Sequence, residues 1–178
     1  RLMSENEAEI ALGEDGLFEV RIGTVNIGQG SDTTMAQIAG DALGVGLESI
    51  RMVHSDTGRV PVDSSTTASR STFHMGNAVV NAADKLRADV IDAASHMLER
   101  NAGALAFSSA GVIVADDPGT GMGYDEIVEQ AGAGFSAIGD CIVGGTFSAP
   151  DGKEYPIAST FWTFAAAGAE VEVDTQTG

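Results

Sequence analysis

The longest regular pattern in the sequence runs from Phe73 to about Arg100 and is typical of an amphipathic helix. Apolar side chains at helical spacing trace one face: Met75, Val79, Ala82, Leu86, Val90, Ala93, Met97 and Leu98. Charged side chains take the other face: Asp84, Lys85, Arg87, Asp89 and Asp92. Gly76 lies early in this helix, where the missing side chain would permit close packing against a neighbour.

Strict alternation of apolar and polar residues predicts a β-hairpin before this helix. Glu7 to Leu12 and Phe18 to Ile22 alternate, and Gly13-Glu14-Asp15-Gly16 between them is a turn with an Asp-Gly pair. A second hairpin is predicted from Leu105 to Phe107 and Val112 to Val114, and Asp116-Asp117-Pro118-Gly119 is interpreted as the turn that ends it.

Shorter patterns complete the prediction. A helix is expected from Ser31 to Leu43, with Gly44 as its C-cap, and a second one from Tyr124 to Gln130. Strands are expected at 50–54, 136–143, 160–167 and 169–173, with loops at 144–145 and 149–152. The sequence therefore predicts an α/β (α+β) fold, in which mixed and antiparallel strands with hairpins pack against two main helices, one of them long.

Composition narrows the class of protein. With 178 residues, 43% of them hydrophobic, the chain can form one domain with a core. The net charge of −17 argues against a nucleic-acid or anionic-membrane surface. Solubility or a salty habitat explains this acidity more simply than a cationic partner does. No apolar run approaches the ~18 residues of a membrane span. Cys141 is the only cysteine, which favours a reducing compartment: the cytoplasm, with the periplasm as the alternative.

The loop Gly28-Gln29-Gly30 connects a predicted strand to the helix that starts at Ser31. Its glycines permit a sharp turn and close approach of a ligand, and Ser31 or Asp32 can cap the helix. A helix N-terminus suits an anionic or polar ligand. Ordinary turn chemistry explains the glycines equally well. A dinucleotide fingerprint is disfavoured, because Thr33 stands where the third glycine should be.

A second loop, residues 55–68, has no periodic pattern and leads into Ser69-Arg70-Ser71-Thr72, which can cap the long helix. If the two helices pack side by side, both positive ends face one ligand, such as a phosphate or a polar heterocycle. Alternatively, Ser69 and Ser71 are simply N-caps.

Other polar residues give weaker signals. His54, His74 and His96 lack metal-ligand spacing, and the loop aspartates 56, 63, 116 and 117 do not match a calcium loop. Phe161, Trp162 and Phe164 are interpreted as core or interface aromatics, and Cys141 as a small buried hydrophobe. No catalytic residue and no metal ligand is assigned.

Three segments together resemble a known family. They are Gly28-Gln29-Gly30 with Thr33, Gln37 and Leu43-Gly44; Asp56-Thr57 and Pro61 with residues 67–72, Gly76 and Ala78-Val79; and residues 170–174 with Thr177-Gly178. The chain resembles the molybdopterin-binding large subunit of the xanthine dehydrogenase and aldehyde oxidase type of molybdenum hydroxylase. The resemblance is strongest from residue 23 to residue 98.

This resemblance implies a site and a cofactor. The pyranopterin of the molybdenum cofactor, as molybdopterin or its cytosine dinucleotide form, would be held by residues of both loops: Gly28, Gln29, Gly30, Ala68, Ser69, Arg70 and Ser71. The family hydroxylates aldehydes, purines, other N-heterocycles or carbon monoxide with oxygen from water. Electrons leave through iron–sulfur clusters and FAD on partner domains or subunits.

The resemblance also implies that residues 1–178 are one partial domain of a longer large subunit. The family's catalytic glutamate lies in a Gly-Glu-Pro segment that this sequence lacks, and no cysteine set for an iron–sulfur cluster is present. We therefore expect the 178 residues alone to be inactive. The alternatives are a non-catalytic α/β ligand-binding or interaction module and, less well supported, a nucleotide-binding domain.

Overall fold

The computed structural model describes residues 6–63, 65–67, 69–141, 146–156 and 166–178. The predicted first hairpin is confirmed: β1 (Glu7–Leu12) and β2 (Phe18–Ile22) pair antiparallel. The apolar members of the alternation are fully buried: Ala8, Ile10, Leu12, Phe18, Val20 and Ile22. The other face carries charge, since Arg21 bonds Glu9 at 2.9 Å and Glu19 at 2.7 Å.

The loop after β2 leads into α1 (Ser31–Leu43), which has the predicted bounds. Gly44 is the C-cap in the left-handed conformation, with φ of 75°, as predicted. The chain then forms a short 3₁₀ turn, Leu47–Ser49, and returns as β3 (Ile50–His54), parallel to β2. In this β2–α1–β3 unit a single loop, residues 23–30, connects the end of β2 to the start of α1.

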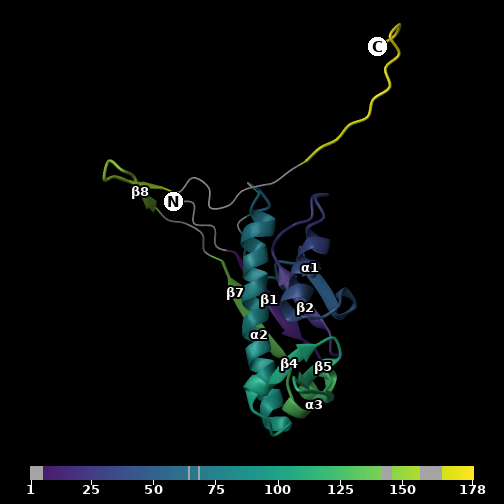
Figure 1. The fold of residues 1–178 in the computed structure, drawn as a ribbon, viewed down its shortest axis with the longest axis vertical. Helices are drawn as coiled ribbons and strands as arrows, with labels where there is room; N and C mark the ends of the chain where they lie inside the picture. The colour runs from purple at the N-terminus through teal and green to yellow at the C-terminus, as the bar shows by residue number, and fades with distance from the viewer. Residues whose placement is uncertain (1–5, 64, 68, 142–145, 157–165) are drawn as a thin grey trace.

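The long helix is confirmed as α2 (Gly76–Met97), preceded by a π-helical turn, η2 (Ser71–Met75). Figure 1 shows α2 running along the sheet beside α1. Gly76 allows the expected close packing, because a Cβ there would lie 3.0 Å from the Ile38 side chain of α1.

The predicted second hairpin follows as β4 (Leu105–Ser108) and β5 (Gly111–Val114), after a 3₁₀ turn at Ala102–Ala104. The interpretation of residues 116–119 as a closing turn is wrong, because Asp117–Met122 forms a third strand, β6. Pro118 is tolerated there because β6 is an edge strand and its register shifts at Val114. The predicted short helix is α3 (Tyr124–Ala131).

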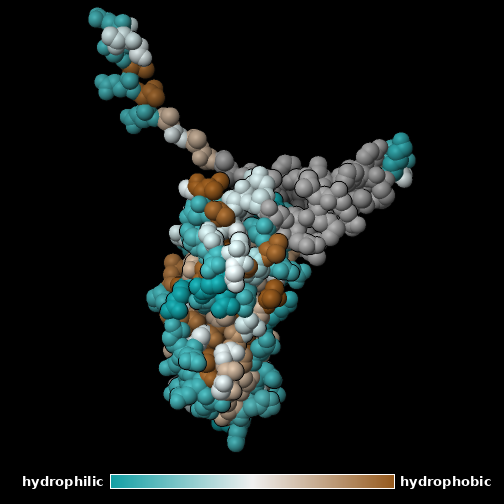
Figure 2. Space-filling model, turned by 180° about the vertical axis from the view of Figure 1, so that it is seen from behind, coloured by the Kyte–Doolittle hydropathy of each residue, from teal (hydrophilic) through white to brown (hydrophobic). Residues whose placement is uncertain are grey.

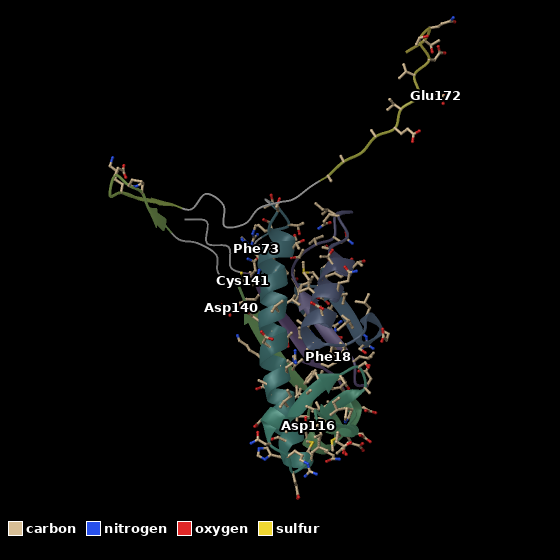
Figure 3. All side chains as sticks on the ribbon, viewed as in Figure 1. Phe18, Phe73, Asp116, Asp140, Cys141 and Glu172 are labelled. Atoms are coloured by element: carbon tan, nitrogen blue, oxygen red, sulfur yellow. The ribbon has the colours of Figure 1, made fainter. Side chains whose placement is uncertain are left out.

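An aromatic cluster joins the second sheet to the first. The Phe18 ring of β2 lies 4.9 Å from that of Tyr124 and 6.3 Å from that of Phe107, between ring centroids. The buried Tyr124 hydroxyl donates to the Ser108 carbonyl at 2.8 Å. Figure 3 shows Phe18 at this junction, away from the end of α2 where Phe73 lies.

The chain finally returns to the first sheet as β7 (Phe135–Asp140), which pairs with β1 and completes the order β3-β2-β1-β7. This confirms the strand predicted at 136–143 up to Asp140, whereas Cys141 lies outside it. The α/β class is also confirmed. No helix among the described residues is both long and apolar enough to cross a membrane.

The last described segments differ more from the prediction. β8 (Thr146–Ser148) and β9 (Glu154–Pro156) form a hairpin around the predicted loop at 149–152. The predicted strand at 169–173 is wrong, because these residues have no neighbouring strand in the described chain and lead away from the body (Figure 1). Val171 and Val173 remain 78% and 60% exposed. Most of the strand predicted at 160–167, and the aromatic residues Phe161, Trp162 and Phe164, lie outside the described residues.

Candidate functional site

The Gly28-Gln29-Gly30 loop takes backbone conformations that favour glycine. Gly28 has φ of 97° and Gly30, the N-cap of α1, has φ of 76°. A Cβ built at either glycine would meet nothing within 4 Å, so the surroundings are open. The glycines here serve the turn and leave room beside the backbone.

The Gln29 side chain folds back onto its own loop. Its Oε1 accepts a hydrogen bond from the Ile27 N–H at 2.7 Å, and its Nε2 donates to the Val25 carbonyl at 3.2 Å. Gln29 is nevertheless exposed to solvent. The amide therefore braces the loop while remaining reachable from outside.

The predicted capping of α1 by Ser31 or Asp32 is wrong. Gly30 occupies the N-cap position and no side chain caps the helix. Ser31 lies inside the first turn, where its Oγ is buried without a hydrogen-bond partner in the described chain. Asp32 instead accepts from Asn26 Nδ2 at 2.8 Å and lies 3.5 Å from His54 Nε2. The first N–H groups of α1 consequently have no intrahelical acceptor and no side-chain cap.

The second loop enters its helix in an unusual way. Ser69 is in the left-handed region, with φ of 57°, and is exposed, whereas Ser71 is half-buried and begins the π-helical turn. No side chain caps this turn, so the interpretation of Ser69 and Ser71 as caps is also wrong. Ala68 lies outside the described residues.

The two loops are joined at Val25. The Thr66 hydroxyl accepts from the Val25 N–H at 2.9 Å and donates to the Val25 carbonyl at 3.1 Å. Gln29 bonds the same carbonyl oxygen, so it converges with the segment that leads to Ser69. No hydrogen bond joins Gln29 directly to Ser69 or Ser71 in the part of the chain that is described. Figure 1 shows the first loop and the start of α2 at the same end of the molecule.

A close backbone approach supports this junction. Thr24 Oγ1 donates to Asp63 Oδ2 at 2.9 Å. A Cβ on Gly23 would lie 2.7 Å from the Asp63 Cβ and 2.9 Å from the Pro61 carbonyl oxygen, so no larger residue fits at position 23. The roles of Thr24, Val25 and Thr66 are not apparent from the sequence, because their pairing spans about forty positions and follows no period.

Arg70 points into the protein. Its Nη1 donates to the Ser65 carbonyl at 2.8 Å, and its Nη2 donates to Asn6 Oδ1 and lies 3.5 Å from Asp63 Oδ1. The neighbouring His74 is also buried, and burial together with the Arg70 charge lowers its pKa, while Asp63 opposes that shift. The guanidinium thus contacts three residues on two segments: Asn6, just before β1, and Asp63 and Ser65 of its own loop.

The other polar candidates take structural or solvated positions. Asp56 accepts from the Gly58 N–H in a turn, and His96 lies on the exposed side of α2, 4.0 Å from Asp92. Burial raises the pKa of the half-buried Cys141 thiol. Among the described residues, no group of three or more His, Cys, Asp or Glu side chains is arranged to hold a metal.

A pocket is also present beside α3, lined by Glu14, Asp125, Val128, Glu129, Gly132 and Ala133. It shares no residue with the two loops. The candidate site is therefore the surface formed by the two joined loops.

Known proteins are similar to this chain in sequence and in fold. The family described as molybdopterin cofactor-binding domain matches residues 1–178. Xanthine dehydrogenase of Oryza sativa subsp. japonica is 32% identical over 178 residues, which are all of this chain and 12% of that protein. The carbon monoxide dehydrogenase large chain of Hydrogenophaga pseudoflava is 40% identical over 96 residues, 54% of this chain and 12% of that one.

Solved structures agree. Reconstituted CO dehydrogenase from Oligotropha carboxidovorans superposes with a TM-score of 0.68 and 30% identity, over 76% of this chain and 18% of that one. Quinoline 2-oxidoreductase from Pseudomonas putida 86 superposes with a TM-score of 0.67 and 25% identity, over 78% of this chain and 19% of that one. The chain therefore spans less than a fifth of the length of each of these relatives. Because the family match covers every residue, the chain belongs to the molybdopterin cofactor-binding domain family.

Proposed function

We propose that these residues form part of the pyranopterin site of a molybdenum hydroxylase of the xanthine dehydrogenase and aldehyde oxidase type. The residues proposed to hold the cofactor are Gly28, Gln29, Gly30, Ala68, Ser69, Arg70 and Ser71. The observation that carries this proposal is the junction at Val25, which brings the two loops together beside the uncapped start of α1. We propose that the full-length enzyme hydroxylates aldehydes or N-heterocycles with oxygen from water.

The residues present fit such a group. The open backbone at Gly28 and Gly30 leaves room for a polar ring, and the N–H groups at the start of α1 suit an anionic substituent. The Gln29 amide offers both a donor and an acceptor at the surface. The buried Ser31 hydroxyl is a further polar group without a partner in the described chain. When bound, the cofactor supplies the redox chemistry, and this chain binds and orients it.

The partners follow from the same proposal. Carbon monoxide dehydrogenase relatives are named large chains, which implies other chains beside them. We propose that the rest of the large subunit, together with iron–sulfur and flavin domains or subunits, completes the enzyme in the cytoplasm. The 178 residues alone, without a catalytic glutamate segment, are expected to be inactive.

Metal and pterin analysis of the full-length protein tests the proposal. We expect molybdenum by mass spectrometry and a fluorescent pterin after oxidative release. Gln29→Ala should weaken retention about fivefold, the equivalent of about 1 kcal/mol for one hydrogen bond. Gln130→Ala, an exposed glutamine on α3, is the matched control. A wild-type protein without molybdenum or pterin, expressed in cells that make the cofactor, would indicate a non-catalytic module instead.

A further inference from the structure

We propose that Arg70 is a positioning residue, whose buried guanidinium fixes the second loop against β1 and the first loop. Among the residues proposed above to hold the cofactor, Arg70 therefore acts indirectly: its guanidinium shapes the loop and does not itself contact the cofactor. The consequence, that Arg70 sets the shape of the site before the cofactor binds, rests on the proposed function. The geometry of the guanidinium stands on its own.

Arg70 connects parts of the chain that are distant in sequence. The Arg70 guanidinium contacts Asn6, just before β1, across 64 positions of sequence, and also the Ser65 carbonyl and the Asp63 carboxylate of its own loop. Asp63 accepts in turn from Thr24, the residue before Val25. A continuous chain of contacts therefore runs from Arg70 through Asp63 to the point where the two loops meet.

The ion pair between Arg70 and Asp63 is buried. The Arg70 and Asp63 side chains are only 9% and 4% exposed, and no hydrogen-bond partner of Arg70 Nε is present among the described residues. A buried charge is tolerated only when opposite charge and hydrogen bonds compensate it, so removal of the arginine leaves Asp63 uncompensated. The loop is then expected to rearrange so that the Asp63 carboxylate reaches water.

The planar shape of the Arg70 guanidinium also suits this role. A planar guanidinium reaches acceptors in different directions at once, whereas a lysine ammonium is a point charge on a flexible stem. Arg70 uses Nη1 for Ser65 and Nη2 for Asn6 and Asp63. Lysine at this position keeps the charge but cannot bond all three partners at once.

The test uses the full-length protein with Arg70→Met, Arg70→Lys and the matched control Arg87→Met. Arg87 is on α2 and, like Arg70, donates to a backbone carbonyl, that of Ala42, at 2.8 Å, but it lies beside Phe107, far from the two loops in sequence. Three quantities are measured: molybdenum and pterin per polypeptide, residue-resolved amide hydrogen exchange, and the melting temperature.

We expect amide hydrogen exchange at residues 23–30 and 63–71 to be faster in both Arg70 variants than in the wild-type protein. Exchange in the core of α2 should change less. Cofactor content should fall roughly tenfold, as for lost supporting contacts at other cofactor sites. Arg87→Met should lower the melting temperature without either effect. Equal loop exchange and equal cofactor content in Arg70→Met and Arg87→Met would overturn the inference.

A second variant keeps the test decisive if Arg70→Met does not fold. Asp63→Asn keeps an oxygen for Thr24 but removes the charge that balances Arg70. It should accelerate exchange in the same two segments, and unchanged exchange there would count against the inference. A wild-type protein that lacks molybdenum would refute the proposed function alone, because the exchange measurement does not depend on the cofactor.

Discussion

His74 is a buried titratable side chain beside the candidate site. Burial first, and then the Arg70 charge, lowers its pKa below the ordinary value of 6.5. The unfolded chain binds a proton on this histidine at a higher pH than the folded protein does. Between these two pKa values the unfolded state therefore holds more protons, and stability falls as the pH falls through 6.5.

His74→Leu should flatten this pH dependence. We expect the urea midpoint of the wild-type protein to fall between about pH 7.5 and about pH 5.5, and that of the variant to fall less, because the group that titrates is gone. His96→Leu serves as the control, since the His96 side chain is 80% exposed. Parallel curves for wild type and His74→Leu would contradict the assignment.

At the scale of elements, α2 lies directly on the edge strand β7. A Cβ on Gly139 would collide with the backbone of Ala78 and Ala82 in α2. Lys85 and Asn81 donate to the Ile138 and Asp140 carbonyls, each at 2.8 Å, so the helix also covers the outer hydrogen-bonding groups of the strand. The packing of the longest helix therefore depends on one glycine.

Gly139→Ala should destabilise the fold by about 3 kcal/mol, the upper end for overpacking, because the obstacle is backbone and cannot rotate away. Chemical denaturation measures the change. Gly119→Ala is the control in another strand: its nearest contact would be the Asp117 carboxylate at 3.6 Å, so it should be almost neutral. A Gly139→Ala protein as stable as Gly119→Ala would show that α2 sits further from β7.

The elements also show what a sequence can predict. The first hairpin, α1 and α2 follow local periodicity, because each buries one face against a core, and their bounds were predicted closely. β6 escaped prediction because its Asp-Pro-Gly start is typical of a turn and only its edge position accommodates it. Residues 169–173 have strand-like alternation, but a strand also needs a hydrogen-bonding neighbour, which sequence pattern does not supply.

The candidate site was predictable only in part. Glycines and serines at helix starts mark the loops, and the roles of Gly28, Gln29, Gly30, Ala68, Ser69, Arg70 and Ser71 toward a cofactor remain predictions. The contacts that join the loops depend on Asn6, Thr24, Asp63 and Thr66, which are unremarkable in sequence. Their partners lie about forty to sixty positions away, so only the fold brings them together.

At the scale of the whole molecule, residues 166–178 are exposed and stand apart from the packed body (Figure 1). Figure 2 shows hydrophobic and hydrophilic residues in alternation along this tail. Its last turn is ordered locally by a hydrogen bond from the Gly178 N–H to the Asp174 carbonyl at 2.7 Å. The tail contributes no buried side chain to the core.

A glutamate-specific protease should therefore cut the 178-residue chain first at Glu170 or Glu172. Mass spectrometry would identify the cuts, and circular dichroism should show the body unchanged after trimming, because the core residues lie in other segments. Glu9, whose side chain is 19% exposed and held by Arg21, is the internal comparison. Earlier cleavage at Glu9 than in the tail would mean that the first sheet opens readily.

The shared oxygen of Val25 has a mechanical consequence. Gln29 and Thr66 both donate to this one acceptor, so a ligand that draws the Gln29 amide outward leaves the Thr66 hydroxyl as the remaining side-chain donor. Movement of the first loop is thereby transmitted to the second, without any hinge or domain rotation.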